Sequence, residues 1–349
     1  MMEEDLVFIG SVAPPISGPG VKHSILIESL EERDFNVDVI NLLNSKIRFL
    51  FRSIGLLFKE NQKIIVGASS KLRLILIPYI SFLIRFNGSR SILMPVGGKM
   101  ADELKRLPEL IRDIYIRSLK DFDHVYVQSE KLKNDLVEMT SLERSYSYIS
   151  NFKKRPSELP EVSYSNPNDL ELVYLGRMAS RKGIFVLIDA FESLKDEIDL
   201  QLHFYGAFLD DEERQKFLSR IKEHENIYYH GEIKPDEINQ RIRDHDIFVF
   251  PTHHKGEGFP GVLLDAFFAG LPVIATDWRF NGEIIEDGVN GYLCEPKNPE
   301  DLAEKIKKFH DDEELLEKIS KNAWEMSEGY DVDEVVDDLI KDMKKFGWF

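Results

Sequence analysis

Cysteine is almost absent from this sequence of 349 residues, because Cys294 is the only one. A single thiol can form neither an internal disulfide nor the cysteine cluster of a structural zinc site. The chain also begins with acidic residues before a short apolar run, whereas a secretory signal begins with basic residues and continues with a longer apolar run. These features indicate a cytoplasmic protein in a reducing compartment.

Long hydrophobic runs are missing too. The longest apolar stretch covers residues 72–86, and it is interrupted by Arg73, Pro78, Ser81 and Arg85. A stretch of this length is too short to cross a bilayer. We therefore expect a chain that is soluble or that lies on a membrane surface.

Basic residues are outnumbered, 45 against 62 acidic residues, which gives a formal net charge of −17 and argues against nucleic-acid binding. The charge is uneven. Residues 1–160 carry a net charge of +3 and residues 161–349 carry −20, whereas residues 46–99 hold ten basic residues and only one acid, Glu60. This asymmetry indicates that the two halves meet different partners.

The length and the globular composition predict about two domains. Short apolar runs alternate with helical stretches, which is typical of α/β domains with parallel sheets. Strands are expected at residues 6–9, 37–40, 63–66, 91–94, 124–127, 172–175, 202–205, 227–230, 247–250 and 273–276. A helix is expected over residues 104–120, and Ser129 is a candidate cap for the next one. The polar, proline-bearing stretch 151–170 is the predicted linker.

The turn after the first strand carries Gly18 and Gly20 ahead of a helix expected from Val21. Glycine allows close backbone approach, and the first amides of a helix bind anions. The turn lacks the Gly-Lys-Ser/Thr of a phosphate-binding P-loop, and His23 occupies the third glycine position of a dinucleotide fingerprint. An ordinary strand–helix turn that only needs glycine explains it equally well.

A cationic turn follows the strand at residues 172–175. Gly176 and Arg177 precede Arg181, Lys182 and Gly183. Arginine binds phosphate with two donors and lysine binds it as a point charge. The alternative is a solvated run of charges, but ligands of such sheets bind at the carboxyl ends of the strands.

The most informative stretch covers residues 250–275. A strand leads into a glycine-rich loop that carries Glu257, and a helix near Gly261 then carries Asp265 in its first turn. Two carboxylates at a helix start suit a ligand rich in hydroxyl groups, and the amides of Gly261 and Val262 suit phosphate or sugar oxygens. The alternative is that Asp265 only interacts with the helix dipole.

These three motifs, in this order and spacing, resemble glycosyltransferase family 4. The resemblance covers nearly the whole chain and is strongest over residues 172–297. It implies an α/β protein with two Rossmann-like domains that face each other across a cleft, the GT-B fold. Residues 1–160 would form the acceptor-side domain, joined by a C-terminal helix at about 328–349 that crosses back. Residues 161–327 would form the nucleotide-sugar-binding domain.

The resemblance also implies roles for single residues. Arg177 and Lys182 would hold the donor diphosphate and stabilise the leaving group, and Glu257 would orient the sugar as the third catalytic residue. Asp265 stands where the family normally has the glutamate that binds the ribose, and it is one methylene shorter. The remaining donor-binding positions implied are Gly18, Gly20, Gly176, Ile233, Gly258, Phe259, Pro260, Gly261 and Val262.

One departure concerns the first domain, where many family members carry a histidine near the reacting sugar. Residues 94–99 contain none. His23, Lys99, His253 and His254 are candidates to line the site, and each is also explained as a structural or solvent-facing residue. The resemblance implies retention of anomeric configuration, with no metal and no cofactor, because an Arg/Lys pair can meet the charge that develops on the diphosphate.

The basic segment mixes cations with large apolar residues, over residues 46–59 and 71–86. Such stretches can lie in a bilayer interface against anionic lipid. We expect peripheral docking at the inner face of the cell membrane through residues 46–86, with a glycan or lipid-linked acceptor. An ordinary core helix with basic edges is the alternative.

Two other kinds of function fit the same motifs. A GT-B enzyme such as a nucleotide-sugar epimerase would need further acid and base residues in the first domain, and a phosphorylase of this fold would need a lysine that carries pyridoxal phosphate. A non-catalytic nucleotide-sugar-binding subunit would fit the change to Asp265 and the missing histidine. Release of nucleoside diphosphate from a nucleotide sugar would separate transfer from the other functions.

Overall fold

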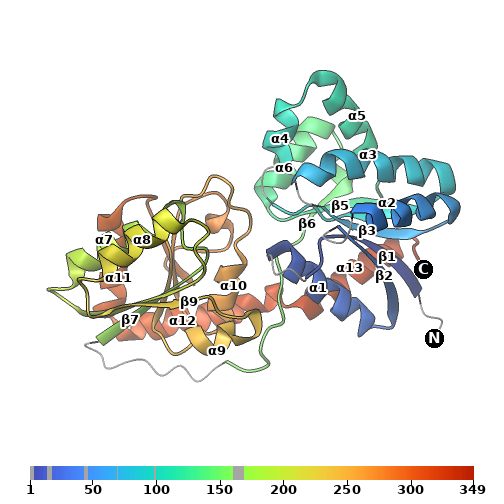
Figure 1. Cartoon of the computed structure of the whole chain (residues 1–349). Helices are drawn as coiled ribbons and strands as arrows, with labels where there is room; N and C mark the ends of the chain where they lie inside the picture. Colours follow the sequence, from blue (N-terminus) through green and yellow to red (C-terminus); the bar gives the residue numbers. More distant parts are fainter. Residues whose placement is uncertain (1–3, 14–17, 43–45, 69, 98–99, 160–168) are drawn as a thin grey trace. The chain divides into compact units, whose positions relative to one another are not determined.

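The computed structural model describes residues 4–13, 18–42, 46–68, 70–97, 100–159 and 169–349. The chain divides into two compact units (Figure 1). The N-terminal unit comprises Met1–Lys154 and Tyr330–Phe349, and the C-terminal unit comprises Arg155–Gly329. Each unit contains a six-stranded parallel sheet between helices, which confirms the predicted α/β fold class.

The sheet of the N-terminal unit has the order β2-β1-β3-β4-β5-β6. Its strands are β1 (Glu4–Gly10), β2 (Phe35–Asn41), β3 (Lys63–Gly67), β4 (Arg90–Leu93), β5 (His124–Val127) and β6 (Tyr146–Tyr148). Its helices are α1 (Gly18–Glu31), α2 (Lys46–Gly55), α3 (Ser70–Asn87), α4 (Met100–Arg106), α5 (Glu109–Leu119), α6 (Glu130–Thr140) and α13 (Val332–Lys345), with short 3-10 turns η1 (Leu56–Phe58) and η2 (Glu143–Ser145). Every predicted strand is present, and β6 was not predicted.

Both faces of this sheet are buried, because successive side chains of a strand point to opposite faces. Leu6 and Phe8 of β1 belong to the hydrophobic cluster that includes α1 and α13, whereas Val7 and Ile9 belong to the cluster that includes α3 and α5. Figure 1 shows α1 and α13 on one side of the strands and α2 and α3 on the other. This two-sided burial explains why the strands read as continuous apolar runs.

Two local predictions can be compared with the helices. The single helix expected at 104–120 is wrong, because the structure has two helices, α4 and α5, that are separated at Leu107 and Pro108. Proline lacks an amide hydrogen and disfavours helical backbone in the residue before it. Ser129 does cap α6, since its side chain accepts a hydrogen bond from the amide of Leu132 at 3.0 Å. Helix α3 continues through Pro78.

The C-terminal tail belongs to the N-terminal unit. Helix α13 packs against α1, and the buried indole of Trp348 donates to Asp123 Oδ2 at 3.1 Å. The hydroxyl of Tyr126 on β5 donates to Asp342 of α13 at 2.7 Å. These contacts tie the end of the sequence to strands that lie more than 200 residues earlier.

The sheet of the C-terminal unit has the order β12-β11-β10-β7-β8-β9. Its strands are β7 (Asp169–Leu175), β8 (Asp199–Tyr205), β9 (Ile227–Gly231), β10 (Ile247–Phe250), β11 (Val273–Thr276) and β12 (Gly291–Cys294). Its helices are α7 (Ile184–Leu194), α8 (Asp211–Ile221), α9 (Ile238–Ile242), α10 (Gly261–Phe268), α11 (Pro299–His310) and α12 (Glu313–Met326), with 3-10 turns η3 (Ser180–Lys182), η4 (Pro235–Glu237) and η5 (Asn281–Glu283). The 3-10 turn η6 (Ser327–Tyr330) spans the boundary between the two units. Only β12 was not predicted among these strands.

Candidate donor-binding site

The C-terminal unit brings the second and third motifs together at the carboxyl ends of β7 and β10, which are neighbours in the sheet. Gly183 is the point of closest approach. It has a φ of +83°, and a Cβ atom there would lie 2.0 Å from the carbonyl oxygen of Pro251. The amide of His253 also donates to the carbonyl of Arg181 at 3.0 Å. Only glycine therefore allows the two loops to approach this closely.

Lys182 and Glu257 form an ion pair at this junction. The Lys182 ammonium lies 2.6 Å from Glu257 Oε2 and 2.9 Å from Oε1. Both side chains are mostly buried, with 13% and 10% of their surface exposed. A charge-assisted pair that is shielded from water is stronger than a surface pair. The structure thus joins two predicted catalytic residues through direct contact.

Three further residues support this pair. The buried hydroxyl of Thr252 donates to Glu257 Oε2 at 2.8 Å, and Thr276 of β11 in turn donates to the carbonyl of Thr252. The indole of Trp278 donates to the carbonyl of His254 at 2.9 Å. Sequence reasoning missed these roles. The position of Thr252, two residues after the end of a strand and five residues before Glu257, was the available signal.

Arg177 lies at the carboxyl end of β7, and its side chain is exposed. The hydroxyl of Tyr174, a fully buried residue, donates to the Arg177 carbonyl at 2.9 Å and so fixes its backbone. Burial, and secondly the charge of Glu257, raise the pKa of Tyr174, so its hydroxyl keeps its proton. Among the residues that the structure describes, no protein acceptor binds the Arg177 guanidinium. This cation is therefore available to an anionic ligand.

Gly176 follows β7 and is held by its amide, which donates to the Tyr205 carbonyl at 3.0 Å. The loop after β8 approaches it closely, because a Cβ atom on Gly206, whose φ is +143°, would lie 1.7 Å from the Gly176 carbonyl oxygen. Sequence reasoning did not single out Gly206. Its backbone packing against Gly176 keeps side chains away from this part of the strand ends.

Helix α10 carries the second carboxylate, at Asp265, which is buried with 4% of its surface exposed. Asp265 is the fifth residue of the helix, and the residue before the helix, Pro260, provides no side-chain cap to its first amides. Gly261 and Val262 are half-buried at that start. The backbone amides at the uncapped start of α10 can donate hydrogen bonds to an oxygen atom of a ligand.

The other predicted donor-binding residues are spread over separate elements. Gly258 and Phe259 lie in the loop between Glu257 and α10, and Phe259 is buried. Ile233 is half-buried in the loop after β9. Gly18 and Gly20 belong to the N-terminal unit, where they form the first turn of α1 rather than the loop that the sequence suggested. Proline suits that turn, and Pro19 stands between them.

The candidates for the missing histidine differ in their surroundings. His23 is buried on α1, with Nδ1 2.7 Å from the carbonyl oxygen of Ser11, and burial lowers its pKa to about 4. His253 and His254 are half-buried in the loop after β10, and burial lowers the pKa of His253. Lys99 lies outside the described residues. Burial therefore favours the neutral form of His23 and His253.

Comparisons with known proteins find similar glycosyltransferases. The model of the family described as "Glycosyl transferases group 1" matches residues 157–326. An uncharacterized glycosyltransferase of Methanocaldococcus jannaschii is 26% identical over 302 residues, which is 82% of this chain and 75% of the relative. The poly(glycerol-phosphate) alpha-glucosyltransferase of Bacillus subtilis is 24% identical over 212 residues. These residues are 60% of this chain but only 31% of that relative.

Solved structures extend the likeness to both units. The structure of Anabaena HepE in complex with UDP has a TM-score of 0.76 and 15% sequence identity, and it covers 98% of this chain and 100% of its own. At this identity the likeness shows the fold alone. It confirms the predicted GT-B fold class, and the family match confirms the resemblance to glycosyltransferases where the motifs are most distinct.

Proposed function

We propose that this chain, whose residues 157–326 match the model of the glycosyl transferases group 1, is a retaining glycosyltransferase that moves a hexose from a nucleotide sugar to a glycan or lipid-linked acceptor. The C-terminal unit binds the donor, and the N-terminal unit serves the acceptor. The contact between Lys182 and Glu257 carries this proposal, because it holds a cation and a carboxylate together at the carboxyl ends of the strands.

Each group of the site has one task in the proposed reaction. Arg177 and Lys182 bind the two phosphates of the donor and stabilise the negative charge that develops as the diphosphate leaves. Glu257 orients the sugar and stabilises the positive charge that develops at the anomeric carbon. The acceptor hydroxyl attacks from the face that the diphosphate leaves, so the configuration is retained. These tasks need fixed protein donors and no metal or cofactor.

Asp265 and the start of α10 bind the polar remainder of the donor. The Asp265 carboxylate accepts hydrogen bonds from the ribose hydroxyls, and the amides of Gly261 and Val262 donate to phosphate or sugar oxygens. Ile233 lies where the base is bound. Because Asp265 is shorter than glutamate, the ribose approaches α10 more closely than it would with the longer side chain.

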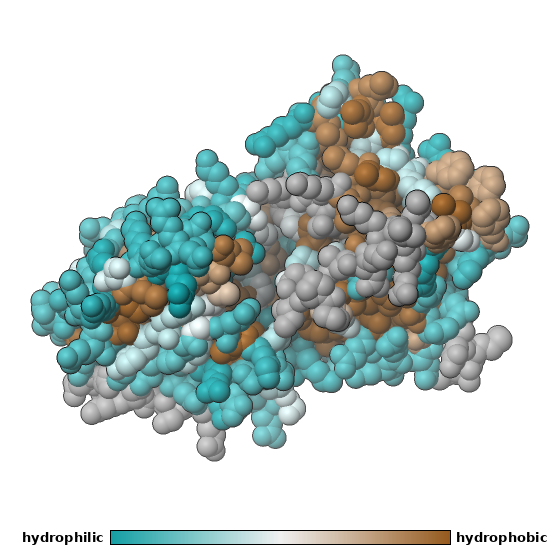
Figure 2. All heavy atoms as spheres, viewed as in Figure 1, coloured by the Kyte–Doolittle hydropathy of each residue, from teal (hydrophilic) through white to brown (hydrophobic). Residues whose placement is uncertain are grey.

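The N-terminal unit supports a second element of the proposal, peripheral docking on an anionic membrane. Exposed apolar side chains gather on neighbouring elements of this unit, and Figure 2 shows hydrophobic atoms over the region of α3 and α5. They are Phe51, Ile54, Phe58, Leu74, Ile75, Phe82, Phe86, Leu110, Ile111 and Ile114, which we call the apolar face. Helix α3 packs against both α5 and η1, and α2 packs against η1, so the elements that carry these residues are neighbours. Exposed patches of this kind mark binding surfaces.

Ion pairs with acidic residues neutralise part of the positive charge that the sequence places in residues 46–86. Arg73 is fully buried and pairs with Glu103 at 2.8 Å, and Arg85 pairs with Asp121 at 2.8 Å. Lys59 beside Phe58 remains exposed. No described helix is both long and apolar enough to cross a membrane. Insertion of the aromatic side chains therefore provides most of the proposed affinity, and cations add a smaller, salt-sensitive part.

Product analysis tests the proposed transfer. The protein is incubated with a panel of nucleotide hexoses, with and without a lipid-linked acceptor, and the released nucleoside diphosphate is measured. We expect release that depends on the acceptor, and a product whose anomeric proton shows by NMR the same configuration as the donor. An inverted product would contradict retention. Conversion of the nucleotide sugar to an isomer without release would instead indicate an epimerase.

A further inference from the structure

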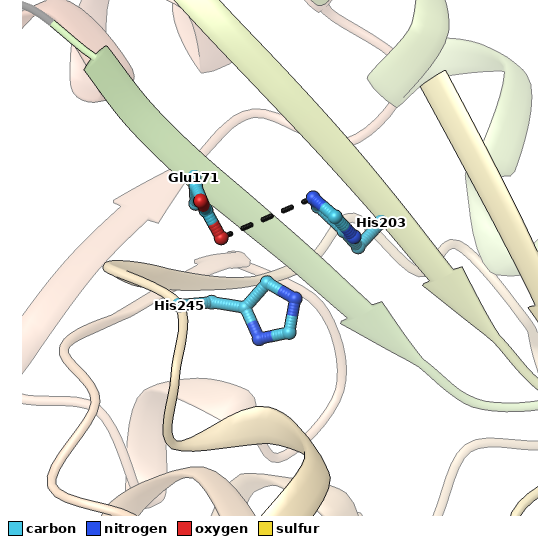
Figure 3. Close-up of side chains that lie close together, drawn as sticks. All are labelled: Glu171, His203 and His245. Carbon is cyan, nitrogen blue, oxygen red and sulfur yellow. Dashed lines mark ion pairs between the residues drawn. The ribbon is translucent and has the colours of Figure 1, made fainter. Parts of the chain in front are cut away.

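Two histidines and a glutamate meet on one face of the C-terminal sheet, away from the strand ends that carry the motifs. Glu171 is on β7, His203 is on β8, and His245 is in the segment between α9 and β10 (Figure 3). Their side chains point toward one another, and one ligand atom from each lies within 4.8 Å of the other two. Glu171 Oε2 and His203 Nε2 are 4.0 Å apart.

The sheet register places these residues together. Val173 is the partner of His203 in the ladder between β7 and β8, and Glu171 is two residues before Val173. Residues two apart on a strand share a face, so Glu171 and His203 lie diagonally on the same side. The His245 segment is tied to this point, because Asp246 accepts a hydrogen bond from the Glu171 amide at 2.7 Å and donates its own amide to the Glu171 carbonyl at 2.9 Å.

Hydrogen bonds orient both imidazole rings. His245 Nδ1 lies 3.0 Å from the carbonyl oxygen of Ile242, and a carbonyl can only accept, so Nδ1 carries the hydrogen and Nε2 keeps its lone pair. His203 Nδ1 lies 3.0 Å from His230 Nε2. When His203 Nδ1 donates in that contact, its Nε2 also keeps a lone pair. Such second hydrogen bonds are typical of histidines that bind metals.

His203 Nε2 itself has no hydrogen-bond partner although it is buried. The distance of 4.0 Å to Glu171 is too long for a hydrogen bond. Burial, together with His245 and His230, lowers the pKa of His203 to about 4, and mainly burial lowers the pKa of His245. A neutral imidazole with a lone pair on one ring nitrogen is the form that binds a metal.

We infer that Glu171, His203 and His245 form a binding site for one divalent transition-metal ion of the zinc type. Two neutral imidazoles and one carboxylate are ligands that zinc prefers, and three protein ligands leave the fourth tetrahedral position to water. Ligand atoms of a tetrahedral zinc ion are about 3.4 Å apart. The ligand atoms must therefore move closer together by up to about 1.4 Å from the spacing seen here, which is at most 4.8 Å.

The proposed ion would link β7, β8 and the segment before β10. Glu171 lies four residues before Leu175, at the end of β7, which corresponds to about 13 Å along a strand. The site is therefore separate from Arg177 and Lys182, and the proposed transfer needs no ion there. Its expected effect is on the stability of the C-terminal unit, because a ligand that binds only the folded chain stabilises it.

Zinc binding to the tag-free, chelator-treated protein tests this inference by isothermal titration calorimetry and equilibrium dialysis. We expect about one zinc ion per chain, and a loss of affinity of at least about tenfold in each of Glu171→Gln, His203→Asn and His245→Asn. His310→Asn is the matched control, because it removes an imidazole from the same unit outside the cluster and leaves binding unchanged. Circular dichroism checks the fold of each variant.

Failure of the wild-type chain to bind zinc would overturn the site, as would unchanged binding in all three cluster variants. X-ray absorption at the zinc edge of the loaded wild-type protein keeps the inference testable if the variants do not fold. We expect nitrogen and oxygen ligands at about 2.0–2.1 Å with outer scattering from two imidazoles. A spectrum without imidazole scattering would exclude this cluster.

Discussion

The ammonium of Lys182 lies 2.6 Å from Oε2 of Glu257, although the two residues are 75 positions apart in the sequence. The contact arises because the loops after β7 and β10 converge at Gly183. Each group compensates the charge of the other. A bound diphosphate would share the Lys182 ammonium with Glu257, so donor binding and the position of the Glu257 carboxylate are coupled in the proposed reaction.

Replacement of Lys182 tests its role toward the leaving group. We expect Lys182→Met to lower kcat by about 10²–10³-fold, since a fixed donor to developing charge contributes on that order. Steady-state release of nucleoside diphosphate measures the effect. Arg181→Ala is the matched control, because Arg181 is an exposed cation next to Lys182 and has no proposed role. Wild-type turnover in a folded Lys182→Met protein would refute the assignment.

The ion pair also makes a prediction about stability. Lys182→Met leaves the mostly buried Glu257 carboxylate with Thr252 as a hydrogen-bond donor, and Glu257→Gln leaves the ammonium without its counter-charge. The two single substitutions together should therefore lower the free energy of unfolding by more than the double substitution does. We expect a coupling free energy of about 0.5–3 kcal/mol between the two positions in a double-mutant cycle of denaturant unfolding. Additive effects would show that the contact contributes nothing.

Gly183 offers a test of the loop approach. We expect Gly183→Ala to destabilise the protein and to reduce activity, because its Cβ atom would lie 2.0 Å from the Pro251 carbonyl oxygen. Gly231→Ala is the matched control, since Gly231 also has a positive φ, +78°, but faces open space. Strain of the backbone alone costs on the order of 1 kcal/mol. A loss of thermal stability equal in the two variants would mean that the close contact has no effect.

Because Lys22 is buried, we expect the free energy of unfolding to depend on pH in the alkaline range. It is buried on α1, where its ammonium lies 4.6 Å from the centre of the Phe152 ring, and burial lowers its pKa to about 7. Between about pH 7 and its unfolded pKa near 10.5, the unfolded chain binds more protons than the folded one. The free energy of unfolding therefore rises with pH in this window.

Lys22→Met isolates that contribution from other titrating groups. We expect the variant to be more stable than the wild type at pH 7, and the difference to shrink as the pH approaches 10, because a neutral Lys22 costs less to bury. Urea unfolding at several pH values measures the difference. If it stays constant from pH 7 to pH 10, Lys22 is not neutralised on folding.

The apolar face predicts binding to lipid vesicles. We expect the protein to float with vesicles that contain anionic lipid, and the double change Phe58→Ser and Phe82→Ser to reduce the bound fraction severalfold, because each lost aromatic group removes apolar contact with the interface. Leu209→Ser is the matched control, since Leu209 is 73% exposed, between Phe82 at 53% and Phe58 at 83%, but lies in the C-terminal unit. Equal flotation of wild type and double variant would contradict docking by this face.

Much of this protein follows from the sequence alone. The uniformly apolar strands and the order of the motifs determine a chain of alternating strands and helices, since burial on both faces of a parallel sheet requires such strands. The cap at Ser129 was also predictable, because a cap depends on atoms within one helical turn. The residue types at Arg177, Lys182 and Glu257 likewise indicate chemistry on a phosphorylated, hydroxyl-rich ligand.

The tertiary structure decided which of these groups meet. The sequence suggested that Arg73 lies at the basic edge of an apolar helix. In the structure it is buried beside Glu103, which is 30 residues away. Glu171, His203 and His245 are spread over three elements and form no motif, yet strand order brings them together. The physical reason is that hydrophobic periodicity and caps depend on neighbours along the chain, whereas ion pairs and ligand clusters depend on which strands are adjacent and on their register.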